Sequence, residues 1–262
     1  LERFAEALAD ARAAAQDERV AVAALLEASL SLDWMTEFAE GNVLAERALD
    51  RAALAGVAPE TPLGRALALA RGRLAVRTGR WDDAVVALAP LERVDPSPAD
   101  IETVLGAHAL LGSVACVQAD LPRAEALFAA GLAHAARWEQ PVAACALWIN
   151  RPMLWMALGR LDDALADFQR AAETSRRLGH AQIERVASHN LAQYLRWRGR
   201  LDEAEALARR AAELARLRLG AVPPADALLL ARLAVSRGSA PEARAARAQA
   251  GPGPFHPYEL LQ

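Results

Sequence analysis

The sequence contains no lysine, because all 30 of its basic residues are arginine. Mechanisms that need a lysine, such as P-loop phosphate binding, Schiff-base formation and kinase-type phosphoryl transfer, are therefore excluded within this chain. Acidic residues slightly outnumber the arginines, and the net charge is −3. A protein that binds DNA or RNA normally carries a positive balance, so a nucleic-acid partner is not expected.

Cysteines and long apolar runs are also scarce. The two cysteines, Cys116 and Cys145, lie in apolar stretches without ligand spacing. They are expected to be buried free thiols, and a disulfide or metal role is the weaker alternative. The richest apolar run, residues 227–235, is interrupted by Arg232. It is too short for a transmembrane helix and no signal peptide is present, so a cytoplasmic protein without membrane contact is predicted.

Motifs of catalysis are missing as well. The chain has no HExxH, GxSxG or CxxC motif and no glycine-rich phosphate loop. Its histidines are scattered, and no two of them have the i, i+4 spacing that would bring them together on one helical face: His108, His134, His180, His189 and His256. We therefore predict neither an enzyme active site nor a cofactor or metal site.

Alanine and leucine are abundant: 54% of residues are hydrophobic although only 5% are aromatic. Both are strong helix formers, and the composition indicates helices packed through small side chains. Within it a short phrase recurs, as Gly79-Arg-Trp-Asp-Asp-Ala84, Gly159-Arg-Leu-Asp-Asp-Ala164 and Gly199-Arg-Leu-Asp-Glu-Ala204. Weaker copies occupy residues 119–124 and 238–243, so successive copies begin 40, 40, 40 and 39 residues apart. A degenerate copy occupies residues 36–41. The chain is therefore a repeat.

Each phrase predicts a turn between two helices. The glycine ends one helix in a left-handed conformation that other residues disfavour. The acidic pair, for example Asp82 and Asp83, then lies in the first turn of the next helix, where the helix dipole favours negative charge. Because the acidic pairs recur at every turn, we interpret them as structural rather than as a general acid and base. Trp81 is interpreted as an apolar anchor of its turn.

These phrases and their surroundings resemble the tetratricopeptide repeat family. Members carry a Leu-Gly-type pair eight and seven residues before the turn glycine, as Leu111-Gly112 and Leu191-Ala192 do here. A small residue follows five after the turn glycine in every copy, and a bulky residue nine after it is met by Leu88, Phe128 and Phe168 but not by Ala208. The period of about 40 exceeds the family's usual 34 residues. Such extended units resemble those of bacterial signal-responsive regulators. HEAT-type repeats are the alternative, which the turn phrase disfavours.

The resemblance implies an all-α, right-handed superhelical solenoid of about six antiparallel helix pairs. Residues 1–250 are predicted as a single repeat domain, and residues 251–262 as a tail or the start of a further element of a longer protein. The period predicts an opening helix at 2–15 and helix pairs at 17–34/37–55, 61–78/81–94, 99–118/121–137, 140–158/161–178, 181–198/201–218 and 224–237/240–249.

The family's architecture also predicts a binding surface, because the first helix of each pair lines the concave side. Residues ten, nine, six and three positions before the turn residue share one face of that helix. From these positions in the second to fifth pairs, with the adjacent Trp197, we predict ten partner-binding residues: Arg73, Ser113, Asn150, Met153, Met156, His189, Asn190, Gln193, Arg196 and Trp197.

The chemistry of these residues suggests how a partner is held. Asn150 and Asn190, 40 residues apart, would clamp backbone amides. Met153 and Met156 suit an adaptable apolar pocket, and Arg196 would pair with a carboxylate. The alternative is that tight curvature buries these groups against neighbouring repeats.

Three functions remain open at this stage. The leading hypothesis is a non-catalytic scaffold or sensor module of a larger bacterial cytoplasmic signalling or regulatory protein, which binds a protein or peptide in its concave groove. The second is a receptor that closes around a small-molecule effector. The third is a structural or oligomerising segment, and the oligomeric state itself is left open.

Overall fold

A computed structural model of the chain describes residues 17–34 and 38–251, and throughout these residues the regular structure is helical. The helices group into two compact units, residues 1–139 and 140–262, which are described separately. Unit 1 contains α2 (Asp17–Trp34), α3 (Phe38–Ala53), α4 (Pro62–Arg77), α5 (Trp81–Leu88), the 3₁₀ turn η1 (Ala89–Leu91), α6 (Ile101–Val117) and α7 (Leu121–Arg137).

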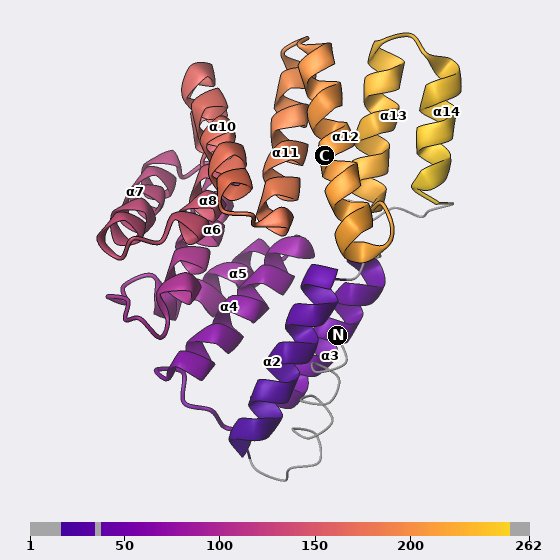
Figure 1. Ribbon diagram of the computed structural model, residues 1–262. Helices are drawn as coiled ribbons and strands as arrows, with labels where there is room; N and C mark the ends of the chain where they lie inside the picture. Colours follow the sequence, from indigo (N-terminus) through magenta and orange to yellow (C-terminus); the bar gives the residue numbers. More distant parts are fainter. Residues whose placement is uncertain (1–16, 35–37, 252–262) are drawn as a thin grey trace. The chain divides into compact units, whose positions relative to one another are not determined.

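Unit 2 contains α8 (Pro141–Asn150), α9 (Pro152–Ala157), α10 (Leu161–Arg177), α11 (Ala181–Trp197), α12 (Leu201–Leu219), α13 (Pro224–Ser236) and α14 (Ala240–Gln249). Consecutive helices pack as pairs, most extensively α2 with α3, α6 with α7, α11 with α12 and α13 with α14 (Figure 1). The predicted all-α class and the helix-pair repeat are confirmed.

Some predictions are not decided by the described residues. The opening helix at 2–15, the start of the degenerate phrase at residues 36–37 and the tail after residue 251 lie outside them. The superhelical sense and the single-domain organisation depend on both units together, and they stay predictions.

Prolines shorten two predicted helices. The helix predicted at 81–94 ends at Leu88 and continues only as η1, because Pro90 has no N–H to donate to the carbonyl four residues before it. The helix predicted at 140–158 is broken at Arg151, and Pro152 begins α9 as its first residue. Proline is favoured at the first position of a helix, where its missing N–H has no partner to lose.

The turns recur in one backbone conformation, which confirms the predicted register. The turn glycines Gly79, Gly159, Gly199 and Gly238 have φ between 72° and 77°. In each copy the residue after the turn residue donates its N–H to the carbonyl five residues earlier, over 2.7–2.9 Å. This is the hydrogen bond of a Schellman motif, which ends the first helix and directs the chain into the second.

Residue 119 is the exception among these turns. Ala119 adopts the same left-handed conformation, with φ 61°, and Asp120 donates to the Ala115 carbonyl over 2.9 Å as in the other copies. The turn therefore imposes its geometry even on a residue whose Cβ disfavours it.

Small residues seven positions before the turn let the two helices of a pair approach closely. A Cβ added to Gly72 would lie 2.4 Å from the Leu88 side chain, and one added to Gly112 would lie 2.7 Å from the Phe128 ring. Leu88 and Phe128 are fully buried. In the fifth pair the same two positions hold Ala192 and Ala208, and both are buried. Alanine in place of glycine on the first helix is thus accompanied by alanine in place of leucine or phenylalanine on the second.

We predict that Gly112→Ala destabilises the protein by about 1–3 kcal/mol, because the new methyl group overlaps the Phe128 ring. Urea denaturation followed by circular dichroism would measure it. In a double-mutant cycle, adding Phe128→Ala should cost less than in the wild type, because the pair then matches Ala192 and Ala208. Additive effects would contradict the predicted close packing.

We also predict opposite signs for two exchanges at the turn position. Ala119→Gly should stabilise the fold by about 0.5–1 kcal/mol, because glycine adopts the left-handed conformation without a Cβ clash. Gly199→Ala should destabilise it by about 1 kcal/mol for the same reason. Calorimetric melting temperatures would test both, and a loss of stability in Ala119→Gly would contradict the interpretation.

Candidate functional site

The candidate site lies on the first helices of the pairs in unit 2. We call it the first-helix face and define it by eight of the predicted residues: Asn150, Met153, Met156, His189, Asn190, Gln193, Arg196 and Trp197. The helices that carry them contact one another in sequence, since α8 contacts both α9 and α11. The other two predicted residues, Arg73 and Ser113, belong to unit 1 and are not part of this surface.

Apolar side chains are exposed on the first-helix face. Trp197 is 62% exposed, and Met153 and Met156 are each more than a third exposed. The Trp197 ring lies 6.0 Å from the ring of Tyr194, which is buried and donates its hydroxyl hydrogen to the Leu161 carbonyl over 2.7 Å. A large aromatic side chain is thus held at the surface by a buried neighbour, which is how interface anchors are presented.

The break at Pro152 sets the position of the methionines. Arg151 donates its backbone N–H to the Leu147 carbonyl over 2.8 Å, and α9 then starts afresh at Pro152. Arg151 also binds the buried carboxylate of Asp167 through two hydrogen bonds of 2.7 Å. The short helix that carries Met153 and Met156 is therefore fixed at its start by a two-pronged ion pair with α10.

Polar residues lie between the apolar ones. Asn190 and Gln193 are half-buried on α11, and Asn150 is half-buried at the end of α8. The Asn150 amide donates to the Ala146 carbonyl of its own helix over 2.7 Å. The predicted pair of equivalent asparagines is present, but Asn150 is partly engaged by its own helix.

His189 has a structural environment rather than a ligand-facing one. It is 4% exposed, and its Nδ1 lies 2.6 Å from the carboxylate of Asp226 on α13. Its Nε2 lies 2.9 Å from the side-chain amide of Gln193, and Arg185 donates to the other Asp226 oxygen over 2.8 Å. The imidazole thus joins α11 to α13 in the interior of unit 2.

The charge state of Asp226 follows from this network. Burial by itself would raise the pKa of the carboxyl group, but the hydrogen bond from His189 and the positive charge of Arg185 outweigh it and hold the pKa below its usual value. Asp226 therefore stays ionised inside the fold, where the ion pairs replace the water it has lost.

In unit 1 the predicted residues are occupied by internal contacts. Arg73 forms a salt bridge with Asp33 of α2. Ser113 is buried and donates its hydroxyl hydrogen to the Ala109 carbonyl over 2.9 Å. The first contact ties α4 to α2 and the second lies within α6, so both side chains are engaged inside unit 1.

Nucleophile and metal chemistry find no support among the described residues. Both cysteines are free, and burial raises the pKa of each thiol to about 11, far from the range of a reactive thiolate. Within residues 17–34 and 38–251, no three side chains of the types that bind metal ions gather at one place. No helix in the same ranges combines the length and the apolarity needed to cross a membrane.

The sixth helix pair contributes residues that the sequence analysis missed. The positions six and three before Gly238 hold Arg232 and Val235, and Val235 is 68% exposed. Burial and the nearby positive charge of Arg196 lower the pKa of Arg232. The same positions before the turn residue that were used for the second to fifth pairs identify Arg232 and Val235 when they are counted back from Gly238.

The geometry defines the chain as an all-α helical-repeat protein. A model of the tetratricopeptide repeat matches residues 186–225, which include most of α11, all of α12 and the start of α13. The chain is thus a TPR-like helical repeat, as the sequence predicted. Proteins with this repeat are generally protein-interaction scaffolds rather than enzymes, and they use extended helical surfaces for binding.

Two solved structures are similar to the chain. BtubC (BKLC) from P. vanneervenii has a TM-score of 0.53 and 16% identity, over 92% of this chain and 94% of that one. PilW, a widely conserved type IV pilus biogenesis factor, has a TM-score of 0.51 and 17% identity, over 86% and 91%. At such identities the similarity shows the fold alone. A search of curated proteins found no match.

We predict that Asp226→Asn destabilises unit 2 by about 3 kcal/mol near neutral pH, because Arg185 and His189 lose a buried carboxylate. Since the folded-state pKa is lowered, the carboxylate stabilises the fold above about pH 4, and this contribution is lost as the pH falls through the folded-state value. The wild type should therefore lose its advantage over Asp226→Asn in acid.

Urea denaturation at a series of pH values would measure both effects. Asp202→Asn is the matched control, because Asp202 also pairs with an arginine but is 95% exposed, and its loss should cost less than about 1 kcal/mol. A similar cost for the two variants would contradict the structural role given to Asp226.

Proposed function

We propose that the protein is a non-catalytic scaffold that binds a peptide or helix of a protein partner on the first-helix face of unit 2. The observation that supports it most is the exposure of Trp197, Met153 and Met156 on helices whose other large apolar side chains are buried or half-buried. Aromatic and thioether side chains give most of the affinity in such interfaces, and methionine adapts its shape to the partner.

Neighbouring polar groups can form hydrogen bonds and an ion pair with the bound peptide and so fix its orientation. Asn190 offers an amide donor and acceptor on the same helix as Trp197, and Arg196 offers a guanidinium, whereas the amide nitrogen of Gln193 is engaged by His189. Amides satisfy the backbone groups of a peptide when it is removed from water, and the guanidinium pairs with a carboxylate. Wider parts of the same proposal are a single repeat domain, a concave groove and a place in a larger bacterial cytoplasmic signalling or regulatory protein. They rest on the sequence resemblance.

The proposal is tested with peptides selected on the wild-type protein from a phage-displayed library. Fluorescence anisotropy of a selected peptide gives its Kd. We expect Trp197→Ala, and the double variant Asn190→Ala with Arg196→Ala, each to weaken binding about tenfold or more, because anchor residues dominate interface energy. Circular dichroism melts would show that both variants remain folded.

Leu217→Ala is the matched control, because Leu217 is 78% exposed but lies on the second helix α12. Its affinity should equal that of the wild type. Wild-type affinity in the Trp197 and Asn190/Arg196 variants, or a library that yields no binding peptide, would contradict the proposal.

A further inference from the structure

A second surface of unit 2 lies beyond the first-helix face and shares only Arg196 with it. It is a groove of about 660 Å³ between the last helix pair and the end of α11, and we call it the α13–α14 groove. Its apolar lining includes Val235 of α13, which is 68% exposed, and Leu228 and Ala231, which are each only 8% exposed. Arg196, Arg232 and Arg244 stand along it, from α11, α13 and α14 respectively.

The preceding helix pair shows what such a surface normally contacts. Residues 39 positions earlier than Leu228, Arg232 and Arg244 are His189, Gln193 and Glu205. α13 and the residue that follows it contact this set. His189 binds Asp226 of α13, and Gln193 binds His189 beside it. Glu205 pairs with Arg237, which directly follows α13, over 3.0 Å. The groove is therefore the repeat's helix-stacking surface, and no helix covers it within residues 17–34 and 38–251.

The charges on this surface are reversed relative to the preceding pair. The carboxylate of Glu205 on α12 forms an ion pair with Arg237, which follows α13. The equivalent position on α14 holds Arg244, which is positively charged. Pro241 likewise replaces Asp202, the other acidic partner of Arg237. A helix that fits this groove must accordingly bring carboxylates where α13 brings an arginine.

Unsatisfied positive charge gives an independent indication of an anionic partner. The buried Nε of Arg196 has no hydrogen-bond partner in the described chain, and Arg244 forms no ion pair with any described residue. Burial and the nearby positive charge of Arg196 together lower the pKa of Arg232. A carboxylate beside Arg196 would satisfy its buried N–H.

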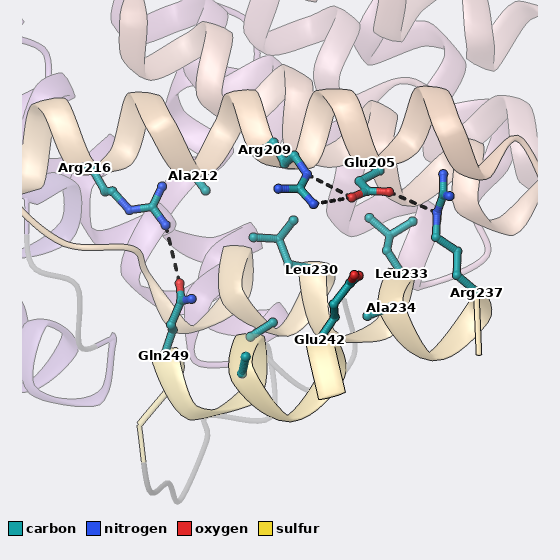
Figure 2. Close-up of a pocket in the computed structure, with 12 residues that line it drawn as sticks. Glu205, Arg209, Ala212, Arg216, Leu230, Leu233, Ala234, Arg237, Glu242 and Gln249 are labelled. Atoms are coloured by element: carbon teal, nitrogen blue, oxygen red, sulfur yellow. Dashed lines mark hydrogen bonds and ion pairs between the residues drawn. The ribbon is translucent and has the colours of Figure 1, made fainter. Parts of the chain in front are cut away.

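The opposite side of the same helix pair provides a contrast. A smaller pocket between α12, α13 and α14 is also flanked by arginines, but there Glu205 lies between Arg209 and Arg237 and binds both, over 2.9 and 3.0 Å (Figure 2). Arg216 donates to Gln249 across that pocket. Arginines facing α12 therefore find acceptors within unit 2, while Arg196 and Arg244 in the α13–α14 groove find none among residues 140–251.

The lining indicates the kind of anion. Proteins that bind single-stranded nucleic acid stack its bases on aromatic side chains, and no aromatic residue lines the groove in the part of the chain that the structure describes. The net charge of −3 also disfavours a long polyanion. An exposed valine above a buried leucine and alanine, set between arginines, instead matches a helix with an apolar stripe flanked by acidic residues.

We propose that the α13–α14 groove docks an acidic amphipathic helix of a protein partner, whose apolar stripe packs on the exposed Val235 and whose carboxylates pair with Arg196 and Arg244. The inference rests on the proposed function only in that both surfaces bind protein. It assigns a separate site and a charge requirement.

The test uses a designed, fluorescently labelled peptide of about 16 residues, or about 24 Å of helix, with leucines on one stripe and glutamates on both sides. Two further peptides replace every glutamate with glutamine or with arginine. We expect saturable binding of the glutamate peptide, about tenfold weaker binding of the glutamine peptide, and salt sensitivity of the first only.

The most informative part of this experiment reverses a charge in the protein. Arg244→Glu should weaken the glutamate peptide about tenfold or more and should create binding of the arginine peptide, a gain that a damaged fold would not produce. Arg177→Glu is the matched control, since Arg177 is exposed on α10 away from the groove, and it should bind like the wild type. Trp197→Ala should leave this binding unchanged, which separates the groove from the first-helix face.

Several results would overturn the proposal. Equal binding of the glutamate and glutamine peptides would remove the charge requirement. An equal loss of affinity for the glutamate peptide in Arg177→Glu and Arg244→Glu would show that binding depends on net charge and not on the groove. A synthetic peptide of residues 252–262 that competes fully would make the groove a site for the chain's own tail. A dimer that light scattering detects in the wild type but not in Arg244→Glu would assign the groove to a second copy.

Discussion

Each helix pair depends on one left-handed residue at its turn and on the hydrogen bond that follows it. The bond from the residue after the turn to the carbonyl five positions earlier recurs at residues 80, 120, 160, 200 and 239. It fixes where the first helix stops and in which direction the second begins, so every later contact inherits its register. At Ala119 the conformation persists without a glycine, so the packed helices on either side over-determine it.

Helix packing then depends on matched volumes rather than on large side chains. Gly72 and Gly112 admit Leu88 and Phe128 against the backbone, whereas Ala192 meets Ala208. Helices that approach this closely leave little space for aromatic side chains between them. Small residues fill that space instead, and many of the buried residues are alanine. Trp197 stands out against this background, because only 5% of the residues are aromatic and its side chain is 62% exposed.

Local features were predictable from the sequence, and features that join distant residues were not. The turn phrase placed the starts of α5, α7, α10 and α12 at the observed residues, because its glycine and acidic pair act within one turn. The breaks at Pro90 and Pro152 follow from local rules as well, but the repeat period outweighed them in the prediction. By contrast, His189 meets Asp226 across 37 residues, so no helical-face rule applied to α11 alone could place it in the interior.

The two surfaces of unit 2 differ in how the sequence reveals them. The first-helix face follows from the offsets before each turn, although Asn150 and His189 are partly or wholly used by the fold. The reversed charge of the α13–α14 groove becomes visible only when Arg244 is compared with Glu205, whose partner Arg237 is known from the structure. Together the surfaces describe a scaffold whose binding chemistry lies on α9, α11, α13 and α14.

The most direct test of this account is hydrogen–deuterium exchange of the protein alone, with the library-selected peptide and with the glutamate peptide. The account predicts added protection of α9 and α11 by the selected peptide, added protection of α13 and α14 by the glutamate peptide, and unchanged exchange in α10 and α12. Protection confined to α10 and α12, with the first helices unaffected, would contradict it.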